Sequence, residues 1–164
     1  MTNKKKIKGV VQTFKHHQRT APKDDYLKYF RPIMYWAKRK YELSNAELHM
    51  MFFLYSEGLF TRSDFNEFNQ ILSWNNERFG NMMRDGWINK WRTQRKNQPA
   101  LYELSFKGKY AVKTIYNKLN GEKISENTNM FKGNQSFSDK VHRNYIKNIN
   151  KDRPKHNCGR LKNH

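Results

Sequence analysis

Hydrophobic residues recur every three or four positions along much of the chain, the spacing that places them on one face of an α-helix. Over residues 24–41 this repeat is carried by Tyr26, Phe30, Ile33, Ala37 and Tyr41. Pro32 lies inside the repeat, and its ring removes a backbone N–H and disfavours a helical conformation of the residue before it. We therefore expect a helix over residues 24–41 that is broken near Pro32.

Three further helices are predicted by residues that can cap their ends. Ser44 and Glu47 have the spacing of a capping box, and Gly58 is suited to end that helix. Thr61, with an acid three residues later, opens a second helix whose inward residues are Phe65, Phe68, Ile71 and Leu72. Ser73 is expected to cap a third helix over residues 74–85, with Phe79, Met82 and Met83 facing the core and Gly86 as its stop.

The pattern then changes to that of a hairpin. Trp87, Ile88 and Trp91 indicate one strand and Leu101–Leu104 a second, and the segment between them, 93–99, holds Arg95 and Lys96 but no hydrophobic residue. Ser105 is positioned to cap a returning helix that contains Tyr110, Val112, Ile115 and Leu119. The order of three helices, a hairpin and a helix predicts a mainly α fold with a small β-hairpin wing, a winged helix-turn-helix flanked by extra helices and basic tails.

The C-terminal part is expected to be simpler. Residues 120–135 are polar and resemble a linker, and Phe137, Val141, Tyr145 and Ile149 then predict one more amphipathic helix. The expected organisation is a basic flexible arm (1–23), a winged helix-turn-helix domain (24–122), a polar linker (123–136) and an amphipathic helix with a basic tail (137–164).

Charge changes this picture, because the net charge of +19 over 164 residues is uneven. Residues 1–23 carry seven basic and no acidic residues (+7), residues 24–122 carry 16 against 11 (+5), and residues 123–164 carry 10 against 3 (+7). Basic arms are attracted to polyanions, most often nucleic acid. The chain has no apolar run near the roughly 20 residues that a membrane-spanning helix needs, and its single cysteine agrees with a reducing compartment. A cytoplasmic or nucleoid-associated protein is expected, with no membrane partner.

The ordered set of motifs over residues 41–115 resembles the winged helix-turn-helix of the MarR-type bacterial transcription regulators. The resemblance is carried by Tyr41-Glu42-Leu43-Ser44, by Leu59-Phe60-Thr61, by Met83-Arg84-Asp85-Gly86-Trp87-Ile88 and by Leu104-Ser105-Phe106-Lys107-Gly108. It implies duplex DNA as the partner, a third helix in the major groove, and homodimers formed through the terminal helices.

Candidate contacts with DNA follow from this arrangement. Residues that could read base edges from the third helix are Asn75, Asn76, Arg78 and Asn81. Cations that could hold the phosphate backbone are Arg84, Arg92, Arg95 and Lys96, with Lys4, Lys5, Lys6 and Lys8 in the arm. The alternatives are that the helix residues form only a solvated face and that the hairpin cations only keep the tip soluble.

Other chemistries are weakly represented. The aromatic residues Trp74, Trp87, Trp91 and Tyr102 could stack on unpaired bases, but core packing is the stronger expectation. The metal-binding residue types His16, His17, His156, Cys158 and His164 are scattered over the two tails, so neither a metal site nor a cofactor is expected. No spacing of nucleophile and base or phosphate-binding loop indicates an enzyme.

We therefore expect a DNA-binding transcriptional regulator, acting as a homodimer. Two alternatives remain. One is a structural or assembly protein, such as a virion or nucleoprotein component, that uses the winged domain as a scaffold for a protein partner and its tails to hold nucleic acid. The other is an RNA-binding accessory factor.

Overall fold

The computed structural model describes residues 26–72, 74–132 and 136–153. These residues form six α-helices, one short 3₁₀ helix and a two-stranded antiparallel sheet. In chain order the elements are α2 (Tyr26–Tyr41), α3 (Asn45–Glu57), α4 (Arg62–Leu72), α5 (Asn76–Arg84), β1 (Ile88–Arg92), β2 (Leu101–Leu104), α6 (Phe106–Leu119), η2 (Asn129–Phe131) and α7 (Phe137–Asp152). The expectation of a mainly helical fold with one small hairpin is confirmed.

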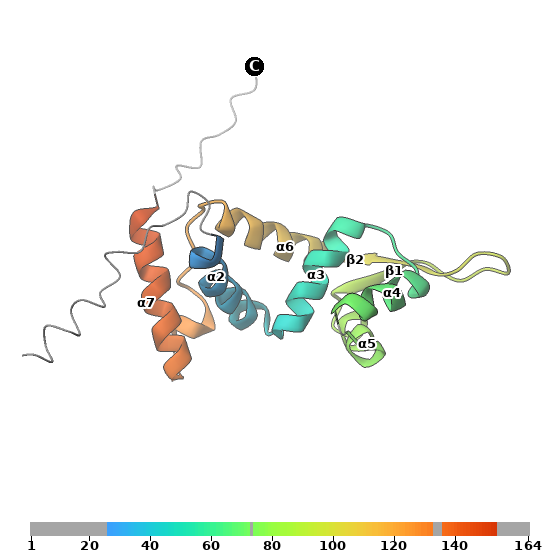
Figure 1. The fold of residues 1–164 in the computed structure, drawn as a ribbon, viewed down its shortest axis with the longest axis horizontal. Helices are drawn as coiled ribbons and strands as arrows, with labels where there is room; N and C mark the ends of the chain where they lie inside the picture. Colours follow the sequence, from blue (N-terminus) through green and yellow to red (C-terminus); the bar gives the residue numbers. More distant parts are fainter. Residues whose placement is uncertain (1–25, 73, 133–135, 154–164) are drawn as a thin grey trace, which may run out of the picture.

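The elements follow one another along an elongated body (Figure 1). Helices α2 and α7 form one end, α3 and α6 lie in the middle, and α4, α5 and the hairpin β1–β2 form the other end. Helix α2 packs on both α6 and α7, while α3 packs on α6 and β2. The hairpin is thus held at the end opposite α7. No helix in the described ranges is long and apolar enough to cross a membrane.

Helix α2 runs through Pro32 without a break, so the predicted interruption is wrong. Proline removes one backbone hydrogen bond from a helix, but Ile33 and Trp36 are fully buried and Met34 nearly so. The Trp36 indole N–H also donates to the backbone oxygen of Ser125 at 3.0 Å. Tyr29 and Phe30, which precede Pro32, also pack against the core, so packing on both sides of Pro32 holds the helix together despite the lost hydrogen bond.

Two of the predicted helix starts are confirmed by their hydrogen bonds. Ser44 and Glu47 form the capping box of α3, which ends at Gly58 with a φ of 76°. At the start of α4 the Thr61 N–H donates to the Asp64 carboxylate at 2.7 Å, and the Asp64 N–H donates back to the Thr61 hydroxyl at 3.2 Å. Phe65 is buried as predicted.

The third helix begins later than predicted. Helix α5 starts at Asn76, and its N-cap is Asn75, whose side-chain oxygen accepts from the backbone N–H of Arg78 at 2.8 Å. Trp74 precedes the helix and is buried, with its ring between those of Phe53 and Phe65. Asn caps helices as well as Ser does, and burial of the Trp74 ring moves the first turn two residues further along the chain.

The hairpin pairs with a third segment of the chain. Ile88 lies opposite Leu104 and Lys90 opposite Tyr102, but the next pair is Arg92 with Leu101, so the register shifts at Trp91. Phe60, between α3 and α4, exchanges two backbone hydrogen bonds with Tyr102, at 3.0 and 2.8 Å. One residue between two helices thus attaches them to the hairpin.

The turn from β2 into α6 has a specific steric requirement. Ser105 donates its N–H to the Trp87 backbone oxygen at 2.9 Å, and its hydroxyl accepts from the Gly108 N–H at 3.1 Å. A Cβ atom at Gly108 would lie 2.9 Å from that same Trp87 oxygen. The Ser-x-x-Gly spacing therefore both caps α6 and lets the helix approach β1 closely.

The segment predicted as a polar linker (123–136) is packed where it is described. Ile124, Thr128 and Met130 are buried, and the Asn150 side chain of α7 makes two hydrogen bonds of 2.9 Å to the backbone of Ile124. The segment packs with only a few apolar residues because it lies beside α2 and α7.

Helix α7 forms as predicted but buries a different face. Of the predicted set only Ile149 is buried, whereas Phe137 is 82% exposed and Tyr145 is 58% exposed. Four residues advance a helix by about 400°, so a strict four-residue repeat drifts by about 40° at each step. Phe137 and Ile149 are three steps apart and cannot share one face. Asp139, Ile146, Ile149 and Asn150 form the buried face instead.

A buried carboxylate joins α7 to α2. Asp139 is 1% exposed and accepts hydrogen bonds from the Tyr35 hydroxyl at 3.0 Å and from the Ser136 hydroxyl and N–H at 2.9 and 3.1 Å. The guanidinium Nε of Arg39 lies 3.1 Å from the same carboxylate. Burial by itself raises the pKa of Asp139, but the hydrogen bonds from Ser136 and Tyr35, together with the charge of Arg39, outweigh it and lower the pKa.

We predict that Asp139→Ala lowers the free energy of unfolding by about 1–3 kcal/mol, because it removes the charged acceptor of the hydrogen bonds from Tyr35 and Ser136. Because the folded-state pKa is lowered, the contribution of Asp139 is complete above its unfolded value of about 3.9 and is lost as the pH falls through the folded value. Urea unfolding of both proteins at about pH 7 and about pH 2.5 measures this difference.

Asp152→Ala is the matched control, since Asp152 is exposed at the other end of the same helix. It should change stability by no more than about 0.5 kcal/mol. Equal losses from the two variants would show that the Asp139 network contributes nothing specific.

Candidate nucleic-acid interface

Helix α5 exposes one polar face at the end of the molecule that carries the hairpin. Phe79 and Met82 are buried and anchor the helix, and the guanidinium of Arg62 lies 4.0 Å from the centre of the Phe79 ring. The opposite face carries Asn76, Glu77 and Gly80, which are exposed. The predicted third helix therefore presents a surface on which an outside partner could lie.

The three asparagines predicted to read bases are engaged within the protein. Asn75 is the N-cap of α5, the Asn76 side-chain oxygen accepts from Arg62 at 2.8 Å, and the Asn81 side-chain oxygen accepts from Arg84. Pairing of Asn with adenine uses the side-chain oxygen as an acceptor and the amide as a donor. Each of these oxygens would have to use its second lone pair or release its present donor.

Arg78 is in a different situation. Arg78 is half-buried, and its guanidinium has no hydrogen bond or ion pair with other residues in the part of the chain that the structure describes. It lines a shallow pocket together with Ser44, Glu47, Asn75, Glu77 and Asn81. Arg78 is therefore the base-reading candidate that could engage DNA without giving up an internal contact.

The segment around α5 is not basic overall. Residues 42–86 carry seven acidic residues against three basic ones, which gives a net charge of −4. The acids Glu47 and Glu77 line the same pocket as Arg78. Phosphates approaching α5 alone would be repelled, so the attraction for a polyanion has to come from other elements.

The hairpin is such an element, because it is rich in cations. Residues 86–102 contain four cations, Lys90, Arg92, Arg95 and Lys96, and no acid. Arg95 and Lys96 are exposed at the tip, where Arg95 and Gln98 exchange two backbone hydrogen bonds at 3.0 and 3.1 Å. Figure 1 shows the hairpin projecting away from the helices. Three of the predicted phosphate contacts, Arg92, Arg95 and Lys96, thus lie together in the hairpin, although Arg92 already donates to the Pro99 oxygen at 3.2 Å. The fourth, Arg84, lies at the end of α5 and donates to Asn81.

Tryptophan packing follows the sequence expectation with one exception. Trp74 and Trp87 are 2% and 4% exposed and Tyr102 is 8% exposed, as expected of core residues. Trp91 is 56% exposed, so its expected place in the core is wrong. It occupies the position where the strand register shifts.

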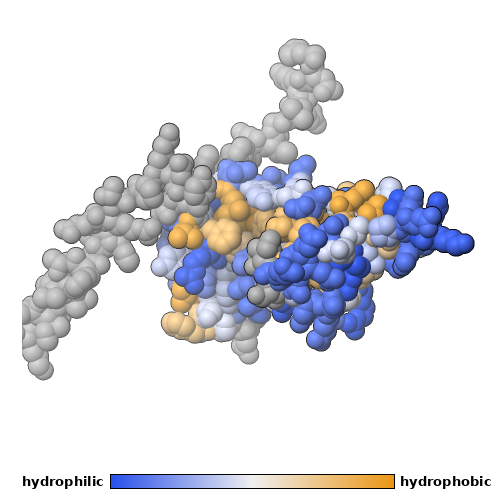
Figure 2. All heavy atoms as spheres, turned by 45° about the vertical axis from the view of Figure 1, so that its right-hand side comes forward, coloured by the Kyte–Doolittle hydropathy of each residue, from blue (hydrophilic) through white to orange (hydrophobic). Residues whose placement is uncertain are grey.

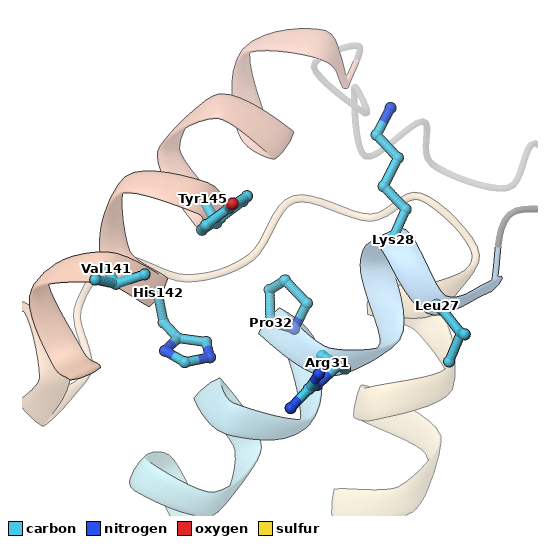
Figure 3. Close-up of a pocket in the computed structure, with 7 residues that line it drawn as sticks. All are labelled: Leu27, Lys28, Arg31, Pro32, Val141, His142 and Tyr145. Atoms are coloured by element: carbon cyan, nitrogen blue, oxygen red, sulfur yellow. The ribbon is translucent and has the colours of Figure 1, made fainter. Parts of the chain in front are cut away.

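A second cationic surface lies at the other end of the molecule. Helix α2 carries five basic residues and no acid. A groove of about 480 Å³ separates it from α7, and Figure 3 shows Pro32 of α2 facing Val141, His142 and Tyr145 of α7. The other lining residues are Leu27, Lys28 and Arg31. In the space-filling view, apolar atoms are exposed across the middle of the face while hydrophilic side chains cover the projecting end (Figure 2).

Two contacts around α5 and the start of β1 could not be predicted from the sequence. Arg62 connects α4 to α5 through the Phe79 ring and Asn76. Lys107 lies 3.7 Å from the centre of the Trp87 ring and donates to the Asp85 backbone oxygen at 3.2 Å. Both depend on aromatic rings brought close by the fold, and neither residue stands out by spacing or composition.

The remaining candidates lie outside the described residues. These are the arm lysines Lys4, Lys5, Lys6 and Lys8, together with the tail residues His16, His17, His156, Cys158 and His164. Within the described ranges, no three His, Cys, Asp or Glu side chains are grouped so as to hold a metal ion.

Comparisons with known proteins add no family assignment. A scan against protein-family models matched none of them. Searches of curated proteins and of solved structures returned no match either. The resemblance of residues 41–115 to MarR-type regulators therefore rests on their sequence motifs, and a function has to be argued from the surface of this chain itself.

Proposed function

We propose that this protein binds duplex DNA as a winged helix-turn-helix protein and regulates transcription, from the cytoplasm or the nucleoid. The observation that carries the proposal is the projecting hairpin, whose four cations outnumber its single acid, Glu103, beside helix α5 with Arg78 in its first turn. A hairpin of this kind can act as a wing that holds phosphates and fixes the register of the helix on DNA.

The order of elements supports the same proposal. Helices α3, α4 and α5 precede the hairpin, and Phe60 between α3 and α4 pairs with β2. This arrangement ties the first and second helices of the set to the wing. In a helix-turn-helix protein the recognition helix enters the major groove with its N-terminal residues toward the bases, and Arg78 lies in the first turn of α5.

The charges assign different roles to the wing and to α5. Since residues 42–86 are net acidic, affinity comes from the wing and from basic residues elsewhere, and α5 contributes discrimination through Arg78. Arg pairs bidentately with guanine, whereas the internally bonded asparagines contribute less. A site containing guanine opposite Arg78 is expected.

The electrostatic part of the proposal predicts a steep dependence on salt. We assume that the wing and the arm neutralise roughly six phosphates. A plot of the logarithm of the association constant against the logarithm of the salt concentration should then have a slope of about −5. Filter binding or fluorescence anisotropy over a salt series measures it. A slope shallower than about −2 would contradict the proposal, and Lys96→Ala should make the slope less steep by about 1.

The reading part of the proposal predicts different effects from two substitutions. Arg78→Ala should cost about 1–3 kcal/mol on a site selected from random duplexes and little on random DNA, while Lys96→Ala should weaken binding to both alike. In vitro selection followed by binding measurements tests this. If no motif is enriched, or if Arg78→Ala leaves the motif unchanged, sequence-specific regulation through α5 is wrong.

The assembly function remains a second candidate because of the apolar surface at α2 and α7. Leu27 is 70% exposed and Tyr145 is 58% exposed, and both line the groove between these helices. Isolated exposed apolar residues are common, but several gathered at a groove indicate a contact with another protein. The same surface is where two subunits of a homodimer could pair.

If α7 pairs two subunits, Phe137→Glu combined with Tyr145→Glu should convert a dimer into a monomer, because both side chains are exposed and a charge there opposes burial. Sedimentation at micromolar concentration measures the change. Phe106→Glu, at an 85% exposed residue of α6, is the control and should leave the assembly intact. Ile149 is buried within the subunit, so substitution there would test folding instead. A monomeric unmodified protein would rule out this dimer.

A further inference from the structure

Trp91 differs from the other three tryptophans of the chain because it is largely exposed to solvent. Trp36, Trp74 and Trp87 are each at most 4% exposed and each has an aromatic ring within 6.4 Å. Trp91 is 56% exposed, and its ring and indole N–H contact no ring, cation or acceptor among the described residues. Isolated exposed apolar residues are common, so the exposure of Trp91 gains meaning only from its position in the strand and from its charged neighbours.

Trp91 belongs to β1 but has no pairing partner in β2. Lys90 pairs with Tyr102 and Arg92 with Leu101, so Trp91 is the extra residue of a β-bulge. A bulge leaves its extra residue unpaired and redirects a side chain, and bulges are enriched beside functional sites. The exposure of Trp91 is therefore built into the strand and does not result from fraying of the hairpin, since residues on both sides of it are paired.

The surroundings of Trp91 are cationic. Its two neighbours in β1 are Lys90 and Arg92, the tip carries Arg95 and Lys96, and residues 86–102 contain no acid. Aromatic rings alternating with cations are what proteins use to hold single-stranded nucleic acid, with the rings stacking on bases and the cations following the backbone.

We propose that Trp91 stacks on an unpaired base next to the duplex held by the wing, so that the preferred ligand is duplex DNA bordered by a short single-stranded segment. This inference rests on the proposed function of DNA binding. It assigns a ligand feature, an exposed base face, that duplex reading by α5 does not require.

An unpaired base is favoured over an intact duplex by its free face. Inside a duplex both faces of each base are covered, and opening a step costs a few kcal/mol. An unpaired base offers a face without that cost, and stacking on it contributes about 1–3 kcal/mol. A ring on a rigid, paired strand is well placed to receive such a base, because it needs no ordering on binding.

The spacing along the hairpin is compatible with simultaneous contacts. Trp91 and Arg95 are four residues apart, which in extended chain is at most about 13 Å. This is close to the rise of four base steps, each about 3.4 Å, along the axis of a DNA duplex. Trp91 could therefore hold the first unpaired base while Arg95 and Lys96 hold phosphates of the adjoining duplex.

The test compares the full-length protein on a blunt duplex and on the same duplex carrying a short unpaired thymidine overhang. Trp91→Ala should weaken binding to the overhang substrate about tenfold, the equivalent of about 1.4 kcal/mol, and binding to the blunt duplex less than about twofold. Trp91→Phe keeps a ring and should retain most of the affinity. Phe106→Ala, which removes an exposed aromatic ring from another element, is the matched control and should change neither.

Tryptophan fluorescence provides a second readout that does not depend on the Ala variant folding. Stacking on a base should quench the emission of the unmodified protein on the overhang substrate more than on the blunt duplex. Trp91→Phe should abolish that extra quenching while retaining binding, since the other three tryptophans are buried.

The outcomes separate this inference from the proposed function. If the unmodified protein binds no DNA, both are wrong. If it binds DNA but Trp91→Ala weakens both substrates equally, or neither, DNA binding stands and the stacking role is wrong. If Trp91→Ala instead changes the sedimentation of the protein without DNA, Trp91 is part of a protein contact and the inference is likewise overturned.

Discussion

The arrangement of the candidate interface depends on the pairing of Phe60 with Tyr102. Two backbone hydrogen bonds of 3.0 and 2.8 Å join the turn between α3 and α4 to β2. The rings of Phe60, Phe79 and Tyr102 then meet pairwise, with centres 5.3–6.3 Å apart. Because Phe79 belongs to α5, this one cluster sets the position of α5 relative to the hairpin. The Trp87 N–H also donates to the Met82 backbone oxygen at 2.8 Å, so the cluster and the turn after α5 together fix Arg78 relative to the hairpin cations.

Charge is distributed over the fold in a way that a single net value conceals. Residues 42–86, which include α3, α4 and α5, are net acidic. Helix α2 carries basic residues without an acid, and the hairpin carries four cations and one acid, Glu103. A polyanion would therefore be attracted to the hairpin and repelled by the acids around α5. It could approach α5 only while it also contacts the hairpin cations. This separation suits a protein in which affinity and selectivity reside in different elements.

The polar face of α5 illustrates a conflict between structure and recognition. Asn75 stabilises the start of the helix, and Asn76 joins it to Arg62 of α4. An N-cap contributes about 1 kcal/mol to stability, so using Asn75 to read a base would weaken the helix that presents it. A solvated face and a reading face have the same composition, and only the hydrogen bonds distinguish them.

Much of the fold followed from the sequence because its signals are local. The caps at Ser44, Thr61 and Ser105 act within three residues of themselves, so spacing alone predicts them. The cations of the hairpin tip are equally local, since a short connection between two strands has to expose them. These features established the order of the elements and the position of the basic hairpin.

Contacts between distant residues decided the rest. Pro32 remains helical because Trp36 and its neighbours are buried, and α5 begins at Asn76 because Trp74 packs between Phe53 and Phe65. The face that α7 buries is selected by Asp139, whose partners Tyr35 and Arg39 lie about a hundred positions earlier. The exposure of Trp91 likewise follows from the register of β1 against β2. Periodicity states which residues could be buried together, but burial is a property of two surfaces, and the second surface exists only once the chain has folded.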